Sequence, residues 1–359
     1  MSTRSSRAAA PTRHTTLADV ARAAGVVPMT ASRAINNTGY VSDDVRERVL
    51  KAASELNYRP NMLARSLKGQ TLKAIGIMLP DIANPFSAEL VAGIQKELTG
   101  NGYSAFLATA HRSVELETAA LDAFVDHRVA GVIVATRGTA LGDDAIAEIV
   151  RSGVPVVTVG RPVEGAKVDC VTADHRKGAY EAVNHLLKLG HRRIGFMGIA
   201  PEHASNLRRF QGYKDALEEH GIELRNELIV GPESSPAYAT EEDGYAAMMK
   251  IGALTRRPTA ILARNDYTAM GALHAAQELG IRVPSEISMV SFDNTPISAH
   301  TTPPLTTVAQ PISEQGSRAA RFLLDRIEGR FKGGGRMVSL ECQLVVRKST
   351  ARIAKKGRP

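Results

Sequence analysis

The sequence has little cysteine and no long apolar run, and each scarcity excludes a class of protein. Cys170 and Cys342 are the two cysteines, and because no CxxC pair occurs, a disulfide framework and a cysteine zinc site are excluded. A membrane-spanning helix needs about 18 consecutive apolar residues, and no such stretch occurs. No apolar secretory segment follows the basic, polar N-terminus, so we expect a cytoplasmic protein without a membrane partner.

The motifs of common enzyme classes are absent as well. The first expected strand is not followed by GxGxxG, and GxxxxGKS, GxxxxGKT, GxSxG and HExxH do not occur. The ten histidines are scattered, and the closest pair, His185 and His191, lies around an expected helix end, where the carbonyl dipole favours histidine. We therefore predict a protein that is not an enzyme and that uses no metal and no cofactor.

The positive charge lies at the two ends of the chain. Residues 1–70 hold 11 Lys and Arg against 5 Asp and Glu, and residues 345–359 hold 6 against none. The remaining residues hold 28 basic against 32 acidic side chains, so the middle of the chain is mildly acidic. This distribution predicts a polyanionic partner for the ends. Solubility and flexible basic tails remain the alternative explanation for residues 1–13 and 350–359.

From about residue 73 onward, short apolar runs alternate with amphipathic segments. Residues 74–79 form an expected strand and residues 86–98 an expected helix. Further strands are expected at residues 103–108, 132–135, 154–159, 168–172, 193–198, 259–263 and 287–292. A body of about 270 such residues exceeds one doubly wound sheet, since the chain is roughly twice as long as the ~150 residues of one domain. We predict an α/β body of two doubly wound parallel-sheet lobes with a cleft between them.

The first 60 residues carry no strand signal and predict a small all-α module. Thr16 caps a helix that ends near Ala24, Gly25 turns the chain, and a second helix runs from Pro28 to about Asn36. Ser42 is the expected cap of a third helix. The apolar face of that third helix is formed by Val45, Val49, Ala52 and Leu56.

Residues 16–36 fit a helix-turn-helix, a unit that places the start of its second helix in the major groove of DNA. Pro28 and Met29 stand at that start, and Arg33, one turn later, can reach the O6 and N7 atoms of a guanine. The candidates for phosphate contacts are Thr16, Thr30, Ser32 and Asn36. A small helical bundle that docks another protein is the alternative.

The motif T-L-x-D-V-A-x-x-A-G-V-x-x-x-T-x-S-R-x-x-N, followed by V-S and by E-L-N-Y-R-P-N-x-x-A-R-S-L, resembles the lactose/galactose (LacI/GalR) family of bacterial transcription regulators. The resemblance covers essentially the whole chain, because the body is similar to that family's effector domain, which is periplasmic binding protein-like. It implies a homodimer on near-palindromic double-stranded operator DNA. It also implies a hinge helix in the minor groove, formed by Asn61, Met62, Ala64, Leu67 and Lys68, with Leu67 as a wedge that bends the duplex. A linker leucine packed on the body is the alternative for Leu67.

One residue of the head departs from the family's pattern. The family usually has Ser or Thr where Val27 stands, and valine cannot cap the second helix, a loss of ~1 kcal/mol. Pro28 at the first helical position partly offsets this loss, because its φ is already helical.

Polar residues follow four of the expected strands of the body: Asn84, Arg161, Asn265 and Asp293. Open α/β sheets bind ligands at the carboxyl ends of their strands, so these residues predict an effector site. Each also has an ordinary explanation, such as a helix cap for Asn265, a turn for Asp293 or an ion pair for Arg161. The resemblance implies the same four positions and adds Phe86, Arg209 and Gln310, with Asp81, Ser87, Asp174 and Ile312 as weaker candidates.

Gly160 is a second departure from the family's pattern. Sugar-binding relatives often have Asp at this position, directly before Arg161. With Arg161 and Arg209 expected at one cleft and this acid missing, an anionic or carboxylated polyol is favoured over a neutral sugar. A neighbouring acid in place of the missing one is the alternative.

The sequence thus predicts a DNA-binding transcription regulator, a repressor, that is controlled by a sugar, a sugar acid or a similar polar metabolite. The expected parts are a basic arm (1–13), the helix-turn-helix domain (14–60), the hinge (61–72), the body (73–349) and a basic tail (350–359). Lobe 1 is expected at about 73–172 and 310–337, and lobe 2 at about 173–309 and 338–349. The chain ends in ARIAKKGRP, without the family's leucine-heptad tail, so we expect a dimer. The alternative is a sugar-binding or sugar-modifying α/β protein with an accessory protein-docking head.

Overall fold

The computed structural model describes residues 15–58, 72–110, 113–135, 140–163, 167–198, 204–231 and 240–353. The chain divides into two compact units, Met1–Gln70 and Thr71–Pro359, which we call the head and the body. Within the described ranges, none of the helices is long and apolar enough to cross a membrane.

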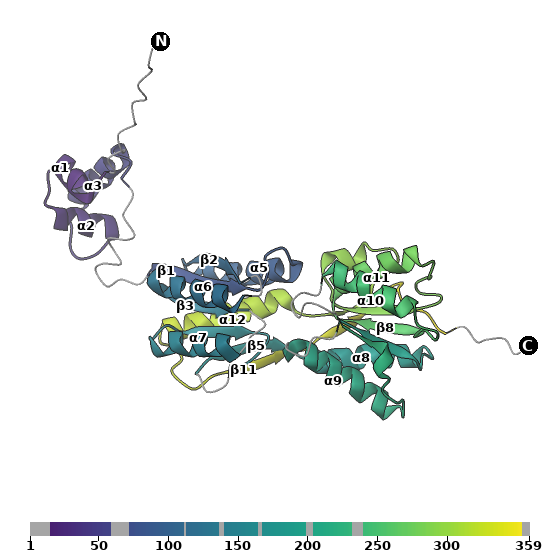
Figure 1. Cartoon of the computed structure of the whole chain (residues 1–359). Coiled ribbons are helices and arrows are strands. Elements are labelled where there is room, and N and C mark those ends of the chain that lie inside the picture. The colour runs from purple at the N-terminus through teal and green to yellow at the C-terminus, as the bar shows by residue number, and fades with distance from the viewer. Residues whose placement is uncertain are drawn as a thin grey trace, which may run out of the picture. The chain divides into compact units, whose positions relative to one another are not determined.

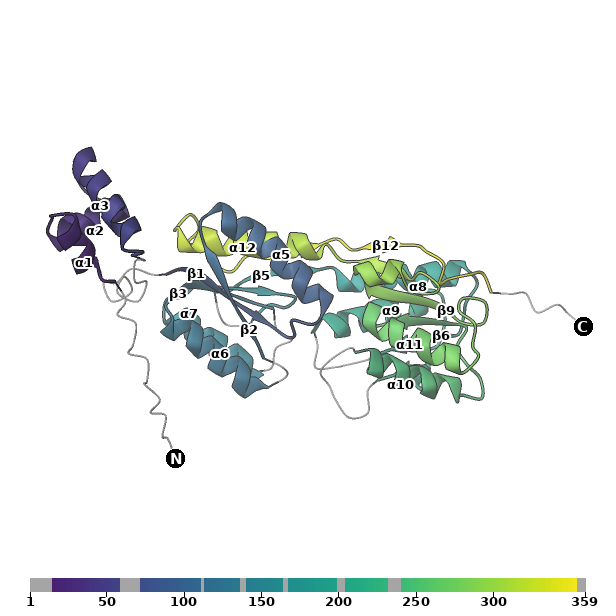
Figure 2. The same ribbon diagram turned by 90° about the horizontal axis from the view of Figure 1, so that it is seen from above.

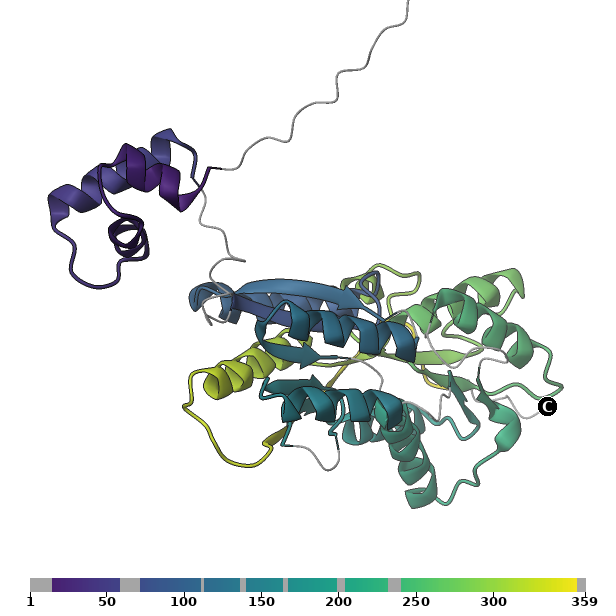
Figure 3. The ribbon, with the colours of Figure 1, turned by 60° about the vertical axis from the view of Figure 1, so that its left-hand side comes forward.

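The head contains three helices, α1 (Leu17–Ala23), α2 (Pro28–Asn36) and α3 (Asp43–Glu55), shown in purple in Figures 1 and 3. They pack around a small core that is rich in alanine, which lets the helices approach closely. The fully buried members of this core include Val20, Ala31 and Val49. Gly25 turns the chain between α1 and α2 with a φ of +67°, a conformation that costs glycine little.

The predicted cap of α1 is confirmed, whereas Ser42 stands at the predicted N-cap position of α3 without a capping hydrogen bond. The Oγ1 of Thr16 accepts a hydrogen bond from the backbone N–H of Asp19, and the Asp19 carboxylate accepts one from the N–H of Thr16. Ser42 occupies the N-cap position of α3, but its hydroxyl makes no cap hydrogen bond. Asp43 and Asp44 lie in the first turn of α3, where their negative charges interact favourably with the positive end of the helix dipole. Leu56 lies beyond α3 and is 37% exposed, so it does not belong to the buried face.

Lobe 1 of the body is built on a six-stranded parallel sheet in the order β11-β5-β4-β3-β1-β2. Its strands are β1 (Leu72–Leu79), β2 (Ser104–Thr109), β3 (Val129–Val134), β4 (Val156–Val159), β5 (Asp169–Ala173) and β11 (Met337–Leu340). Helices α5 (Pro85–Gly100) and α12 (Ile312–Ile327) cover one face, and α6 (Val114–Asp126) and α7 (Ala140–Arg151) cover the other (Figure 2). The inner strands β3, β4 and β5 are buried on both faces, which explains their apolar runs, whereas the edge strands β2 and β11 are partly exposed.

Lobe 2 repeats this architecture with the order β12-β10-β9-β8-β6-β7. Its strands are β6 (Ile194–Met197), β7 (Ile229–Val230), β8 (Ala260–Ala263), β9 (Ser288–Asp293), β10 (Thr306–Ala309) and β12 (Gln343–Val345). Its helices are α8 (His175–Lys188), α9 (Ala204–Glu219), α10 (Glu241–Gly252) and α11 (Asp266–Glu278), with short 3-10 turns η1 (Asn226–Leu228) and η2 (Pro296–Ala299). The predicted fold class is confirmed, with one exception: β12 pairs antiparallel with β10.

The chain passes between the lobes three times: from β5 to α8, from β10 to α12, and from β11 to β12. The sequence predicts the last passage after about residue 337, but β11 still pairs with β5 of lobe 1 as far as Leu340. The predicted boundary is therefore three residues too early, because the partner of β11 lies far away in the sequence. Only two residues separate β11 from β12. Because the chain approaches the lobe interface along β11 and moves away from it along β12, β12 runs antiparallel to its neighbour β10.

Candidate functional site

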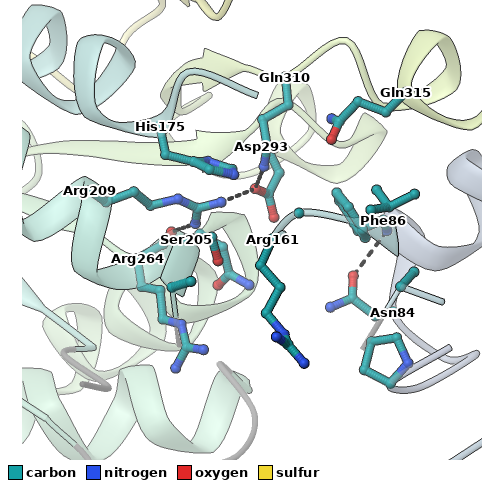
Figure 4. A pocket seen from close by; sticks show the side chains of 16 residues that line it. Asn84, Phe86, Arg161, His175, Ser205, Arg209, Arg264, Asp293, Gln310 and Gln315 are labelled. Carbon is teal, nitrogen blue, oxygen red and sulfur yellow. Dashed lines mark hydrogen bonds and ion pairs between the residues drawn. The ribbon is translucent and has the colours of Figure 1, made fainter. Parts of the chain in front are cut away.

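A pocket lies between the two lobes, at the carboxyl ends of both sheets (Figure 4). The space between its walls is about 800 Å³, a volume that includes the part open to solvent. Lobe 1 contributes Pro80, Asn84, Phe86, Ala135, Val159, Gly160, Arg161 and Gln315. Lobe 2 contributes His175, Ala204, Ser205, Arg209, Arg264, Asn265, Asp293 and Gln310.

The structure brings all seven predicted effector residues to the walls of this pocket: Asn84, Phe86, Arg161, Arg209, Asn265, Asp293 and Gln310. The weaker candidates Asp81, Ser87, Asp174 and Ile312 are not among its described lining residues. Asp174 instead caps α8 by accepting a hydrogen bond from the N–H of Lys177. The placement follows from the parallel sheets, whose strands all end at the same edge.

Two asparagines of the pocket are helix caps. The Oδ1 of Asn84 accepts from the N–H of Phe86 at 2.9 Å, and the Oδ1 of Asn265 accepts from the N–H of Thr268 at 2.9 Å. The capping role and the pocket position therefore coexist. Because the oxygen of Asn84 faces its own helix, its amide nitrogen points into the pocket as a hydrogen-bond donor (Figure 4).

The wall of lobe 2 carries a buried cluster around Asp293. The Oδ1 of Asp293 accepts from the Nε2 of Gln310 at 2.5 Å and from the Nη2 of Arg209 at 3.3 Å. Arg209 also donates to the carbonyl of Arg264, and its guanidinium lies 4.0 Å from the centre of the Phe292 ring. Burial lowers the pKa of Arg209, and the neighbouring Asp293 carboxylate partly counteracts this effect. Both bonds go to Oδ1, so Oδ2 of Asp293 remains directed at the pocket as an acceptor (Figure 4).

Four lining side chains have a buried polar atom without a hydrogen-bond partner in the described part of the chain. These atoms are Arg209 Nε, His175 Nδ1, Gln310 Oε1 and Gln315 Nε2. Burying an unsatisfied polar group costs roughly 1–3 kcal/mol, so such groups are rare and call for an explanation. All four atoms belong to residues that line one pocket, and these residues come from both lobes, which favours a polar ligand there.

Arg161 forms an ion pair with Asp143 of α7. The structure therefore supports the alternative in which a neighbouring acid, Asp143, takes the place of the acid missing at position 160. The argument that the absence of this acid favours an anionic ligand no longer holds. The backbone at Gly160 has a φ of +97°, which aspartate adopts only with strain. Glycine at this position is explained by the turn after β4.

Four polar lining residues are absent from the prediction: His175, Ser205, Arg264 and Gln315. His175 and Arg264 lie just after the carboxyl ends of β5 and β8, so the strand-end signal could have found them. Ser205 and Gln315 lie in first turns of helices, where the sequence shows no comparable signal. Burial and the positive charges of Arg209 and Arg208 hold the pKa of His175 well below its usual value, so its imidazole is neutral near pH 7. No group of three or more potential metal-binding residues occurs within the described ranges.

The side chains predicted to read DNA bases are exposed on α2 of the head. Pro28, Met29 and Arg33 are all exposed, and Met29 and Arg33 are four residues apart, on the same face of the helix. Of the predicted phosphate contacts, Thr16 and Asn36 are exposed, while Thr30 and Ser32 are half-buried. The hinge candidates lie outside the described residues: Asn61, Met62, Ala64, Leu67 and Lys68.

Comparisons with known proteins cover both units. Residues 16–61 match the family described as bacterial regulatory proteins, lacI family, and residues 183–350 match a periplasmic binding protein-like domain. The transcriptional regulator DegA of Bacillus subtilis (strain 168) is 36% identical over 339 residues, 94% of this chain and 98% of DegA. The transcriptional repressor PurR of Mannheimia succiniciproducens is 34% identical over 342 residues, 94% of this chain and 99% of PurR. The crystal structure of the lac repressor dimer bound to operator and the anti-inducer ONPF superposes with a TM-score of 0.82 at 30% identity, covering 94% of this chain and all of that one.

Proposed function

The chain belongs to the LacI family of bacterial transcription regulators, and we propose that its effector is a small hydroxylated metabolite, a sugar or a sugar acid, held in the pocket between the lobes. As a member of this family the protein is a sequence-specific DNA-binding repressor that acts as a homodimer on operator DNA and responds to a small molecule. It is not an enzyme. The alternative of a sugar-modifying protein with a protein-docking head finds no support in these relatives. Because operator DNA lies in the bacterial cytoplasm, we propose that the protein acts there.

The four unpartnered buried atoms of the pocket carry this proposal. The acceptor Oδ2 of Asp293 and the donor Nε of Arg209 lie on one wall, and such a donor and acceptor pair matches two neighbouring hydroxyl groups. Gln310 Oε1 can accept a further hydroxyl proton. Phe86 offers an apolar face to the carbon skeleton of the metabolite.

A ligand that also binds the hydrogen-bond donors of lobe 1 changes the conformation of the body. Asn84 and Gln315 are in lobe 1, whereas Arg209, Asp293 and Gln310 belong to the wall of lobe 2. A ligand that binds both sets stabilises the arrangement in which the walls are close together. The body then changes the DNA affinity of the protein to the extent that this arrangement has a different affinity for the operator.

For the head, we propose that Arg33 reads a guanine and that Pro28 and Met29 contact neighbouring base edges. Thr16, Thr30, Ser32 and Asn36 are the proposed phosphate contacts, and the proposed minor-groove contacts are Asn61, Met62, Ala64, Leu67 and Lys68. The exposure of Pro28, Met29 and Arg33 on one helix supports the first of these roles. Binding to DNA is expected to weaken steeply as the salt concentration rises, because phosphate contacts release counterions.

A thermal-shift screen of sugars, sugar acids and nucleobases with the purified protein tests the nature of the effector, because a ligand of the folded body raises the melting temperature. The decisive variant is Gln315→Leu. It removes an unsatisfied donor, so the unliganded protein is expected to keep its stability while the shift caused by the effector disappears.

Gln277→Leu on the exposed face of α11 is the matched control, and it should retain the full shift. A Gln315→Leu variant that still responds like the wild type would remove this pocket from consideration. A screen in which nucleobases alone raise the melting temperature would replace the proposed ligand class.

A further inference from the structure

Asp266, the first residue of α11, is fully buried and is not among the described residues that line the pocket. Its carboxylate is nevertheless the acceptor of four hydrogen bonds. Oδ1 accepts from the hydroxyls of Ser291 at 2.5 Å and Thr307 at 2.8 Å. Oδ2 accepts from the backbone N–H of Thr295 at 2.7 Å and from its hydroxyl at 2.8 Å.

Each hydrogen-bond partner of Asp266 belongs to a segment that carries a pocket residue. Ser291 of β9 precedes Asp293 by two residues, and Thr295 follows Asp293 by two residues. Thr307 of β10 stands three residues before Gln310. One carboxylate therefore joins the start of α11, next to Asn265, to the two sides of Asp293 and to the strand that leads to Gln310.

The turn held by Asp266 has a strained backbone. Asp293 has a φ of +102° and Asn294 a φ of +57°, and both are non-glycine residues. Such conformations are unfavourable for residues other than glycine and persist where the surroundings impose them. The bond from the Thr295 N–H to Asp266 constrains the turn directly, and Arg347 donates to the side chain of Asn294 at 2.7 Å.

We propose that Asp266 is the positioning residue of the pocket: by fixing the strained turn at Asp293 and the end of β10, it orients the carboxylate of Asp293 and the amide of Gln310 toward the ligand without touching the ligand itself. The inference rests on the proposed function of the pocket. A purely structural role would not require a charge, since buried ionised groups are poor stabilisers compared with apolar residues of similar size. The charged neighbours of Asp266 are Asp293 and Arg209.

The test compares Asp266→Asn with Ser291→Ala in the full-length protein. Asparagine can keep the two hydroxyl bonds on its oxygen, but its amide nitrogen then meets the Thr295 N–H donor to donor. Ser291→Ala removes one bond to the same carboxylate and leaves intact the bond of the Thr295 N–H to Asp266 and the bond of the Asn294 N–H to the Thr307 hydroxyl. Hydrogen exchange of the unliganded proteins is expected to be at least tenfold faster at the Thr295 amide in Asp266→Asn and unchanged there in Ser291→Ala.

Calorimetric titration with D-glucose and D-gluconate supplies the second readout. Whichever probe binds the wild type is expected to bind Asp266→Asn at least tenfold more weakly and Ser291→Ala within threefold of the wild type. Equal exchange rates at Thr295 in both variants, or equal affinities, overturn the positioning role. A wild-type protein that binds neither probe contradicts the ligand class proposed above, and the exchange comparison then decides the role of Asp266. If Asp266→Asn does not fold, Thr295→Val takes its place, with faster exchange at this turn than in Ser291→Ala as the expected result and equal rates as the contradicting one.

Discussion

The head and the body hold their binding residues in opposite environments. In the head, the proposed base contacts Pro28, Met29 and Arg33 are exposed and lie within six residues of one helix. In the body, the proposed effector contacts extend along the chain from Asn84 to Gln310, and most of those in lobe 2 are almost fully buried. The head can therefore change its specificity at little cost to folding, whereas removing a buried, paired side chain from the lobe 2 wall of the pocket also lowers the stability of the body.

The largest effect is expected from Arg209→Ala, which removes a buried charged side chain from the lobe 2 wall of the pocket. Removing one partner of a buried ion pair leaves Asp293 uncompensated, which costs roughly 3–5 kcal/mol of folding free energy. The response of operator binding to the effector should be lost as well, while operator binding itself persists. Chemical denaturation and fluorescence anisotropy with labelled operator measure the two effects.

The neighbouring Arg208→Ala serves as the matched control, because Arg208 is exposed on the same helix. We expect it to change the free energy of unfolding by less than about 0.5 kcal/mol. A loss of stability as large as that of Arg209→Ala would show that burial is not the source of the difference.

The buried Asp266 is expected to make the stability of the body depend on pH. Burial, together with the charge of Asp293, raises the pKa of Asp266 from 3.8 to about 6. The folded state therefore binds the proton of this carboxyl more tightly than the unfolded state does. Protonation stabilises the fold below about pH 4, and this stabilisation, roughly 3 kcal/mol in full, is lost as the pH rises from about 4 through about 6. Relative to Asp266→Asn, which does not ionise there, the wild type should lose unfolding free energy between pH 4 and 7. A difference that stays constant over this range would contradict the raised pKa.

In the head, Arg33→Ala should act on DNA recognition alone. Loss of a base contact is expected to cost ~1–3 kcal/mol of operator affinity per half-site, with little change on random DNA and none in the melting temperature. Anisotropy titrations with operator and random duplexes measure the difference. Arg22→Ala on α1, where the side chain is exposed and pairs with Asp19, is the control. Equal losses on both duplexes would make Arg33 a phosphate contact.

The smallest effect is expected at Val27. This residue has the extended backbone of an N-cap, and its side chain makes no cap hydrogen bond. Val27→Thr should stabilise the head by up to ~1 kcal/mol, because a hydroxyl at the N-cap can accept from a free N–H of the first turn. Thermal unfolding of the full-length protein, followed at the head by hydrogen exchange, measures the gain. Val27→Ala supplies no acceptor and should show no gain; an equal gain there would exclude capping as the cause.

The sequence by itself determined the head almost completely. The cap at Thr16, the turn at Gly25 and the bounds of α2 depend on residues within four positions of one another, so local spacing predicts them. The exceptions are Leu56, which lies beyond α3 and is exposed, and Ser42, whose position at the N-cap was predicted correctly but whose hydroxyl makes no cap bond. Rotamer choice at an exposed cap depends on surroundings that the spacing does not contain.

In the body, the sequence determined which strands end in polar residues, and because parallel strands end at one edge, this was enough to predict Asn84, Arg161, Asn265 and Asp293. Only the tertiary structure decided how these side chains are paired. The partner of Arg161 is Asp143, 18 residues earlier, and the partners of Asp266 lie 25 to 41 residues away. Such pairings form across the sheet and between helices when the lobe packs. No local pattern in the sequence encodes these pairings. For the same reason Gln315 was not predicted as a pocket residue and the last passage between the lobes was predicted three residues too early.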